Sequence, residues 1–136
     1  MSKYLERSKE LRAMAQPHIN CTQGVVMPFA EEAGLTEEQV QKIFANFGGG
    51  MRRASQCGAV TGGIAVLGMF GADDISTVGE YYRILKERHE GMLDCADLLK
   101  ASAARGEVKK VHCDGLVFEC LTLAEEMLRE RGLLPD

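Results

Sequence analysis

Hydrophobic side chains recur along this chain at intervals of three and four residues, with charged side chains between them. This spacing is typical of amphipathic helices. It predicts helices over residues 2–16, 21–29, 36–47, 56–70, 77–90, 95–103 and 113–131. Because no pair of partner strands is evident, we expect an all-α fold. The prediction is a compact helical bundle of five to seven helices, in a single domain covering residues 1–136.

Short polar motifs mark several of the expected helix starts. Capping boxes begin at Thr36 and at Thr77, each with an acidic or amide residue three positions later. Asn20 and Asp94 can cap the helices that follow them. The segment 105–110 has the composition of a solvated connection before the last helix.

The segment 56–70 differs from the others because small and apolar residues surround it on every side. Its β-branched residues would permit a strand, but it is too long and lacks a partner. A buried, glycine-rich central helix is therefore predicted. Each glycine costs about 1 kcal/mol of helix propensity. The expected compensation is close approach of a neighbouring helix or of a cofactor, and the same surface would suit a homodimer.

Charge and hydropathy exclude several classes of partner. The net charge is −4, from 16 basic and 20 acidic residues, and no basic block stands out. A nucleic-acid partner is therefore not expected. The longest nearly uncharged run, 59–72, is too short to cross a bilayer, and the polar start does not resemble a signal peptide. We expect a cytoplasmic protein with no membrane partner.

The cysteines change this picture of an ordinary helical domain. Their number is odd and no CxxC pair occurs, which argues against a disulfide framework. Four of them fall within the first turn or so of a predicted helix, where unpaired N–H groups and the helix dipole favour a thiolate. Were these helix ends to converge, they would form an electropositive pocket suited to a metal–sulfur cluster or a stabilised thiolate. The four are Cys21, Cys57, Cys95 and Cys113.

Other polar residues near these cysteines are less specific. Cys120 lies in the apolar stripe of the last helix and is expected in the core. His18 and His112 lie close to two of the cysteines in sequence and could be ligands or proton donors, although a lone histidine is more often a surface or capping residue. The segment 48–53 has three glycines and two arginines, but it matches neither the P-loop nor the dinucleotide fingerprint. A turn that brings Cys57 to the pocket is the preferred interpretation.

In its ordered cysteines and glycine core the chain resembles a known family, the bacterial and archaeal redox-active proteins named for the pattern C_GCAxxG_C_C. The resemblance covers about residues 18–125. The core is Cys-Gly-Ala where the name has Gly-Cys-Ala, and glycine is expected where Arg52 and Ala54 stand. The resemblance implies a redox or iron–sulfur role, in a family without an assigned reaction. The matching residues are Asn20-Cys21, the run 47–51, the run 57–62, Cys95 and Cys113.

Two functional classes and one structural alternative remain open. In the first, Cys21, Cys57, Cys95 and Cys113 hold an iron–sulfur cluster or another metal for electron transfer. In the second, the chain is a thiol–disulfide redox protein. One low-pKa cysteine attacks a disulfide and another resolves the mixed disulfide, with Cys57 and Cys21 as candidates. Both need a redox partner protein. In the third, the chain is a helical interaction domain with incidental cysteines.

Overall fold

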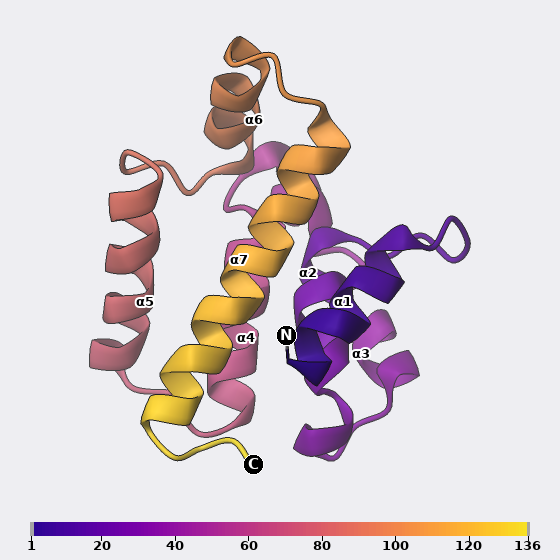
Figure 1. Cartoon of the computed structure of the whole chain (residues 1–136), viewed down its shortest axis with the longest axis vertical. Coiled ribbons are helices and arrows are strands. Elements are labelled where there is room, and N and C mark those ends of the chain that lie inside the picture. The colour runs from indigo at the N-terminus through magenta and orange to yellow at the C-terminus, as the bar shows by residue number, and fades with distance from the viewer. Residues whose placement is uncertain (1, 136) are drawn as a thin grey trace.

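The computed structural model describes residues 2–135, and helices joined by turns and loops make up its fold (Figure 1). An isolated antiparallel bridge between Gln56 and Asp94 is the only β-pairing among these residues. The all-α prediction is therefore confirmed. The helices are α1 (Lys3–Ala13), α2 (Cys21–Val26), α3 (Glu37–Ile43), α4 (Gly58–Met69), α5 (Ile75–Arg88), α6 (Cys95–Ala104) and α7 (Lys109–Glu130), with short turns at Met27–Phe29, Glu31–Ala33 and Gly50–Ala54.

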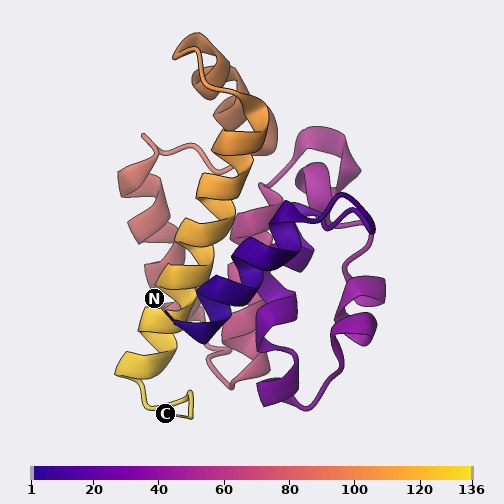
Figure 2. The ribbon, with the colours of Figure 1, turned by 45° about the vertical axis from the view of Figure 1, so that its right-hand side comes forward.

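Helix α4 occupies the centre of the bundle. It packs chiefly against α2 and α7, and α7, the longest helix, also packs against α1, which lies across it in Figure 2. In Figure 1, α5 lies on one side of α7 while α1, α2 and α3 lie on the other. Along α4, Ala59, Val60, Val66 and Leu67 are all buried, whereas Gly68 is exposed. The prediction of a buried, glycine-rich central helix is thus confirmed for most of its length.

Two of the predicted helix starts have the expected caps. The side chain of Asn20 accepts a hydrogen bond from the backbone N–H of Gln23, whose side chain accepts one from the N–H of Asn20. Thr36 and Gln39 form the same reciprocal pair at the start of α3. These polar pairs satisfy N–H groups that would otherwise lack partners at the helix ends.

Other boundaries differ from the prediction. Helix α5 is capped by Asp74, whose carboxylate accepts a hydrogen bond from the backbone N–H of Thr77 (2.9 Å), so Thr77 lies inside the helix. Helix α7 begins at Lys109 and not at Cys113, because lysine is a good helix former and the polar segment continues the helix. Helix α1 ends at Ala13, before the expected stop at residue 16.

The glycines of α4 allow it to lie close to α2. A Cβ atom on Gly58 would be 2.8 Å from Oγ1 of Thr22, and one on Gly62 would be 2.8 Å from Cβ of Val25. The Thr22 hydroxyl also donates to the carbonyl oxygen of Gly58 at 2.8 Å. Because these two glycines are four residues apart, they lie on one face of the helix. Close helix approach therefore accounts for both.

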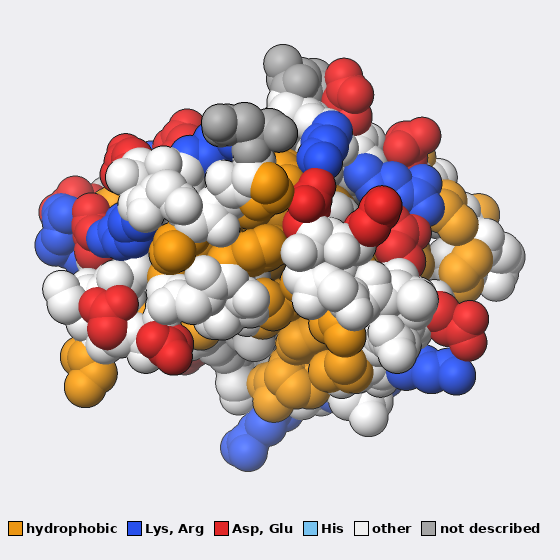
Figure 3. All heavy atoms as spheres, turned by 90° about the horizontal axis from the view of Figure 1, so that it is seen from below, with side chains coloured by type: hydrophobic (Ala, Val, Ile, Leu, Met, Phe, Trp, Pro, Cys, Tyr) orange, Lys and Arg blue, Asp and Glu red, His pale blue; other side chains and the backbone are white. Residues whose placement is uncertain are grey.

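The surface mixes charged and hydrophobic side chains. Figure 3 shows the lower end of the molecule, where hydrophobic groups reach the surface between acidic and basic ones. Ile75 is 93% exposed at the start of α5. Within residues 2–135, no helix has both the length and the apolar character needed to cross a membrane.

Candidate functional site

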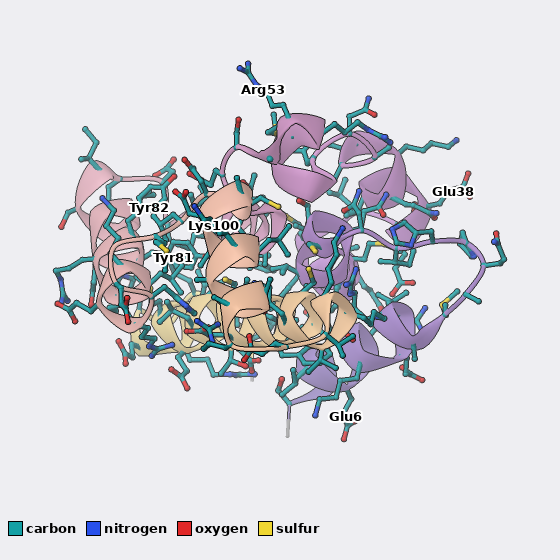
Figure 4. The ribbon with its side chains drawn as sticks, turned by 90° about the horizontal axis from the view of Figure 1, so that it is seen from above. Glu6, Glu38, Arg53, Tyr81, Tyr82 and Lys100 are labelled. Atoms are coloured by element: carbon teal, nitrogen blue, oxygen red, sulfur yellow. The ribbon has the colours of Figure 1, made fainter. Side chains whose placement is uncertain are left out.

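A cavity of about 480 Å³ lies at the end of the bundle where α2, α4 and α6 begin and α7 makes its first turns. The structure brings all four motif cysteines into its wall, although they are far apart in the sequence. Figure 4 looks onto this end of the molecule from above. The cysteines are Cys21, Cys57, Cys95 and Cys113.

Cys21 is positioned by the cap of its helix. It is the first residue of α2, directly after Asn20. The Asn20 side-chain amide donates to the carbonyl oxygens of Phe44 (3.0 Å) and Ala45 (3.3 Å), which ties the start of α2 to the end of α3. A Cβ atom on Gly48 would lie 2.5 Å from Cβ of Asn20, so this glycine leaves the space that the capping residue fills.

Cys57 and Cys95 are held by a short antiparallel pairing of the chain. The N–H of Cys57 donates to the carbonyl oxygen of Leu93 at 2.8 Å, and the N–H of Cys95 donates to that of Ser55 at 2.6 Å. These bonds flank the isolated bridge described above. Successive residues of an extended chain point to opposite faces. Both cysteines therefore share the face opposite the bridging pair, and this face lines the cavity.

The turn before Cys57 has an unusual backbone. Gly50 has φ of +62°, and a Cβ atom there would lie 2.9 Å from Cβ of Cys95. Positive φ values continue at Met51 (62°), Arg52 (59°) and Ala54 (56°). Left-handed backbone costs a non-glycine residue about 1–2 kcal/mol. Arg52 and Ala54 are the positions at which the family resemblance calls for glycine, and the left-handed backbone supplies the reason.

The thiols of Cys21 and Cys113 form the most strongly interacting pair in the cavity. Interaction with the Cys21 thiol lowers the pKa of Cys113 to about 7, and the positive charge of Arg12 acts in the same direction against burial. The same interaction, together with burial, raises the pKa of Cys21. Of the two thiols, Cys113 therefore ionises more readily.

Arg12 connects this pair to the end of α1. Its Nε donates to Oδ1 of Asp114 at 2.8 Å and its Nη1 donates to the carbonyl oxygen of Ile19 at 2.7 Å. Lys110 donates to the same carboxylate and to the carbonyl oxygen of Arg12 (2.7 Å). This network fixes a buried cation beside the thiols. Sequence reasoning missed it because nothing in the local sequence relates Arg12 to residues on the last helix.

The remaining cysteines are less acidic. Burial raises the pKa of Cys57 to about 11, although the N–H groups of Val60 and Ala59 at the start of α4 act in the opposite direction. Burial is also the first cause of the raised pKa of Cys95 and of Cys120. Position at a helix start therefore does not, by itself, produce an acidic thiol in this protein.

Cys113 also shows that the acidity of a thiol here does not depend on its place at a helix start. Because α7 begins at Lys109, Cys113 lies beyond the first turn of the helix, and its pKa is lowered mainly by Cys21. Cys120 is fully buried and belongs to the hydrophobic core, as the sequence predicts.

Both candidate histidines lie in the cavity wall. The side chain of His112 is 8% exposed, with Nδ1 3.7 Å from a carboxylate oxygen of Glu107. Its Nε2 is buried and has no hydrogen-bond partner among the described residues. Burial lowers the pKa of His112, so the ring is neutral at pH 7. His18 reaches the wall from the segment between α1 and α2.

A metal site would need several ligating side chains close together. Within residues 2–135, no three side chains from His, Cys, Asp and Glu stand close enough together to hold a metal ion. All five cysteines are free thiols. The four sulfurs share one cavity, but as placed they do not fit a four-cysteine cluster. For Cys21 and Cys113, each thiol is the main cause of the other's shifted pKa.

Fold and site together define an all-α protein with a cysteine-lined, positively charged cavity. Residues 19–127 match the profile of the family described as "Putative redox-active protein (C_GCAxxG_C_C)", and the chain belongs to this family. Neither curated proteins nor solved structures give a match. The resemblance noted from the ordered cysteines and the glycine core is therefore confirmed, and with it a redox-active cysteine motif.

Proposed function

We propose that this protein is a thiol–disulfide redox protein that works through Cys113 and Cys21. The observation that carries the proposal is the interacting thiol pair in the cavity wall. Cys113 is partly exposed and has the lowered pKa of an attacking thiol. Cys21 has a raised pKa and keeps its proton until the second step. We therefore assign the attacking role to Cys113 and not to Cys57, the residue that sequence position favours.

The exchange proceeds in two balanced steps. The Cys113 thiolate attacks one sulfur of a substrate disulfide, the substrate S–S bond breaks, and one substrate thiolate leaves with the electron pair. Cys21 then gives its proton to that leaving group and attacks Cys113 in the mixed disulfide, which releases the second substrate thiolate. Two protein thiols are oxidised to one disulfide, and one substrate disulfide is reduced to two thiols.

Serine variants of each motif cysteine test this assignment. The protein is equilibrated with reduced and oxidised dithiothreitol, quenched with acid, and mapped by mass spectrometry. We expect a Cys21–Cys113 disulfide in the wild type and in Cys95→Ser. It should be lost in Cys113→Ser and in Cys21→Ser, with far-ultraviolet circular dichroism unchanged. A dominant disulfide between any other two cysteines would contradict the proposal.

Cluster binding is a second candidate, and one observation favours it. All four motif cysteines line the same cavity, with Arg12 and Lys109 in the same wall, which would suit an anionic iron–sulfur group. The sulfurs would have to move closer together than they are here. Anaerobic purification with iron and acid-labile sulfide analysis decides between the two. Stoichiometric iron that is lost in each of the four serine variants would favour electron transfer over exchange.

A further inference from the structure

The wall of the cysteine cavity has a charge opposite to that of the whole protein. The chain carries a net charge of −4, yet Arg12, Lys109 and Lys110 line the cavity and none of the described lining residues is acidic. Asp114 neutralises part of the Arg12 and Lys110 charge from outside the wall. Lys109 takes part in none of the ion pairs formed within residues 2–135. Positive charge gathered at a concave site attracts anions.

The positive character continues outside the cavity. A wider groove shares part of the cavity wall and is lined by Lys42, Arg52 and Arg53. Its single acidic lining residue among those described, Glu38, is paired with Lys42 at 3.2 Å. Figure 4 shows the Arg53 side chain reaching away from the body of the protein. The basic side chains of this groove therefore extend the positive charge of the cavity along the neighbouring surface.

A second, independent feature points to a ligand in the cavity. His112 contributes to the wall, and its Nε2 is buried without a hydrogen-bond partner in the described part of the chain. A buried polar atom without a hydrogen-bond partner is destabilising unless a ligand satisfies it. Because burial lowers the pKa of His112, the ring is neutral. Nδ1 faces the Glu107 carboxylate, which favours the proton on Nδ1 and leaves Nε2 as an acceptor. A donor group of a ligand would satisfy this nitrogen.

The size of the cavity limits the kind of disulfide that can enter. A volume of about 480 Å³ lies within the usual range for small-molecule sites. Cys57 is only 6% exposed, and Cys21 and Cys113 are half-buried. A disulfide buried in the surface of a folded protein would not reach these sulfurs without rearrangement. A small and flexible disulfide would.

We infer that the cavity takes a low-molecular-weight disulfide whose substituents carry carboxylates. This inference rests on the proposed exchange reaction and names its substrate class. Lys109 and the neighbouring cations attract the carboxylates, Nε2 of His112 accepts a hydrogen bond from a donor group of the same ligand, and the S–S bond faces Cys113. The products are two small anionic thiols and the Cys21–Cys113 disulfide, by the two steps given above.

Three small disulfides of similar size test the charge preference. Dithiodipropionate is anionic, hydroxyethyl disulfide is neutral and cystamine is cationic. Reduced protein is mixed with each under argon, and formation of the Cys21–Cys113 disulfide is timed by mass spectrometry. Each rate is divided by the rate of the same disulfide with a neutral reference thiol, N-acetylcysteine amide. At low salt we expect dithiodipropionate to exceed hydroxyethyl disulfide by about tenfold and cystamine to be slowest, with the differences shrinking as salt is added.

A matched pair of variants tests the cause of that preference. Lys109→Gln removes a charge from the wall and should reduce the preference for dithiodipropionate by about threefold or more. Lys100→Gln removes the same charge from an exposed site on α6 outside the wall and should leave the preference unchanged. Equal effects of the two substitutions would overturn the assigned role of the wall.

The outcomes separate this inference from the proposed function. Equal normalised rates for the three disulfides, or faster reaction of cystamine, would overturn the substrate class. If oxidised dithiothreitol still forms the Cys21–Cys113 disulfide in that case, the exchange function stands alone. If neither the three disulfides nor oxidised dithiothreitol forms it, the exchange function and the substrate class both fail.

Discussion

Arg12 and Asp114 join the first and last helices through a hydrogen bond of 2.8 Å from Nε to Oδ1, and the Arg12 side chain is only 6% exposed. Asp114 directly follows Cys113 in α7. The contact therefore holds Cys113, the nearby Cys21 thiol and a buried positive charge in one place. It couples the electrostatics of the cavity to the packing of α1.

Replacing Arg12 tests this coupling. In Arg12→Gln we expect the pKa of Cys113 to rise, because the variant loses a positive charge that favours the thiolate. Alkylation of Cys113 by iodoacetamide at pH 7 should slow, as followed by peptide mapping. Stability to urea should fall by about 2–3 kcal/mol, less than for a fully isolated buried pair because Lys110 still contacts Asp114.

The matched control is Arg7→Gln. Arg7 pairs with Glu37 at 2.7 Å, but the two side chains are 40% and 38% exposed. Such a pair contributes about 1 kcal/mol or less, and it lies outside the cavity wall. Its removal should leave the alkylation profile of Cys113 unchanged. An equal slowing in both variants would point to a general structural effect.

The Cys21 thiol is the main cause of the lowered pKa of Cys113 and should therefore set the pH dependence of Cys113 alkylation. Wild-type alkylation of Cys113 should reach half its maximum near pH 7, since its pKa is about 7. In Cys21→Ala the main cause of the lowering is absent, and the midpoint should move upward toward the ordinary value of 9.0. A midpoint that stays near 7 in this variant would show that another group stabilises the thiolate.

Alkaline conditions should destabilise the fold through its buried thiols. The pKa of Cys57 is raised from 9.0 to about 11 in the folded protein. Above pH 9 the unfolded chain releases this proton while the folded chain retains it, so the unfolded state is favoured. The contribution is fully present below pH 9 and is lost as pH rises toward 11. Urea titrations across this window should show falling stability, with a shallower slope in Cys57→Ala.

Gly63 and Gly68 on α4 offer a direct test of close helix packing. A Cβ atom on Gly63 would lie only 1.9 Å from the hydroxyl oxygen of Tyr81, which is fully buried. Gly63→Ala should therefore destabilise the protein by about 3 kcal/mol. Gly68→Ala has nothing within 4 Å of the new atom and should stabilise by about 0.5–1 kcal/mol through helix propensity. Thermal unfolding compares the two, and equal effects would refute the packing argument.

The backbone of Ala54 is strained, and a glycine at this position should relieve the strain. Its φ of 56° lies in the left-handed region, so Ala54→Gly should stabilise the protein by up to about 1 kcal/mol. Ala103 is exposed within α6, and Ala103→Gly should destabilise by about 0.5–1 kcal/mol. The same substitution, alanine to glycine, should therefore raise the denaturation midpoint at position 54 and lower it at position 103. A loss of stability at both positions would show that the turn tolerates alanine without strain.

Most of the helices could be predicted from the local sequence because recognisable residues mark where they begin and end. Asn20 and Thr36 are good caps followed by amide partners, and both were correctly placed. The start of α5 was missed because Asp74 is as good a cap as Thr77, and local sequence does not rank them. The start of α7 was missed because Lys109 suits both a helix and a solvated loop.

The candidate site was only partly accessible from sequence. The cysteine motif and the glycine core indicated which sulfurs to consider, and the loop geometry then explained why glycine is expected at the positions of Arg52 and Ala54. The pairing of Cys21 with Cys113 depends on how α2 and α7 pack on α4. The lowered pKa of Cys113 depends on a neighbour and not on its place in the helix. Neither this pairing nor the lowered pKa of Cys113 can be predicted from the spacing of residues in the sequence.

The glycine content of α4 also sets an order of events during folding. Twelve residues with four glycines would be a random coil in isolation, since short helices are marginal and each glycine costs about 1 kcal/mol. This segment therefore becomes helical only when it docks between α2 and α7, and Cys57 reaches its place only then. Before docking, Cys57 lacks the burial that raises its pKa in the folded protein. Thiol reactivity can thus serve as a built-in indicator that the chain has finished folding.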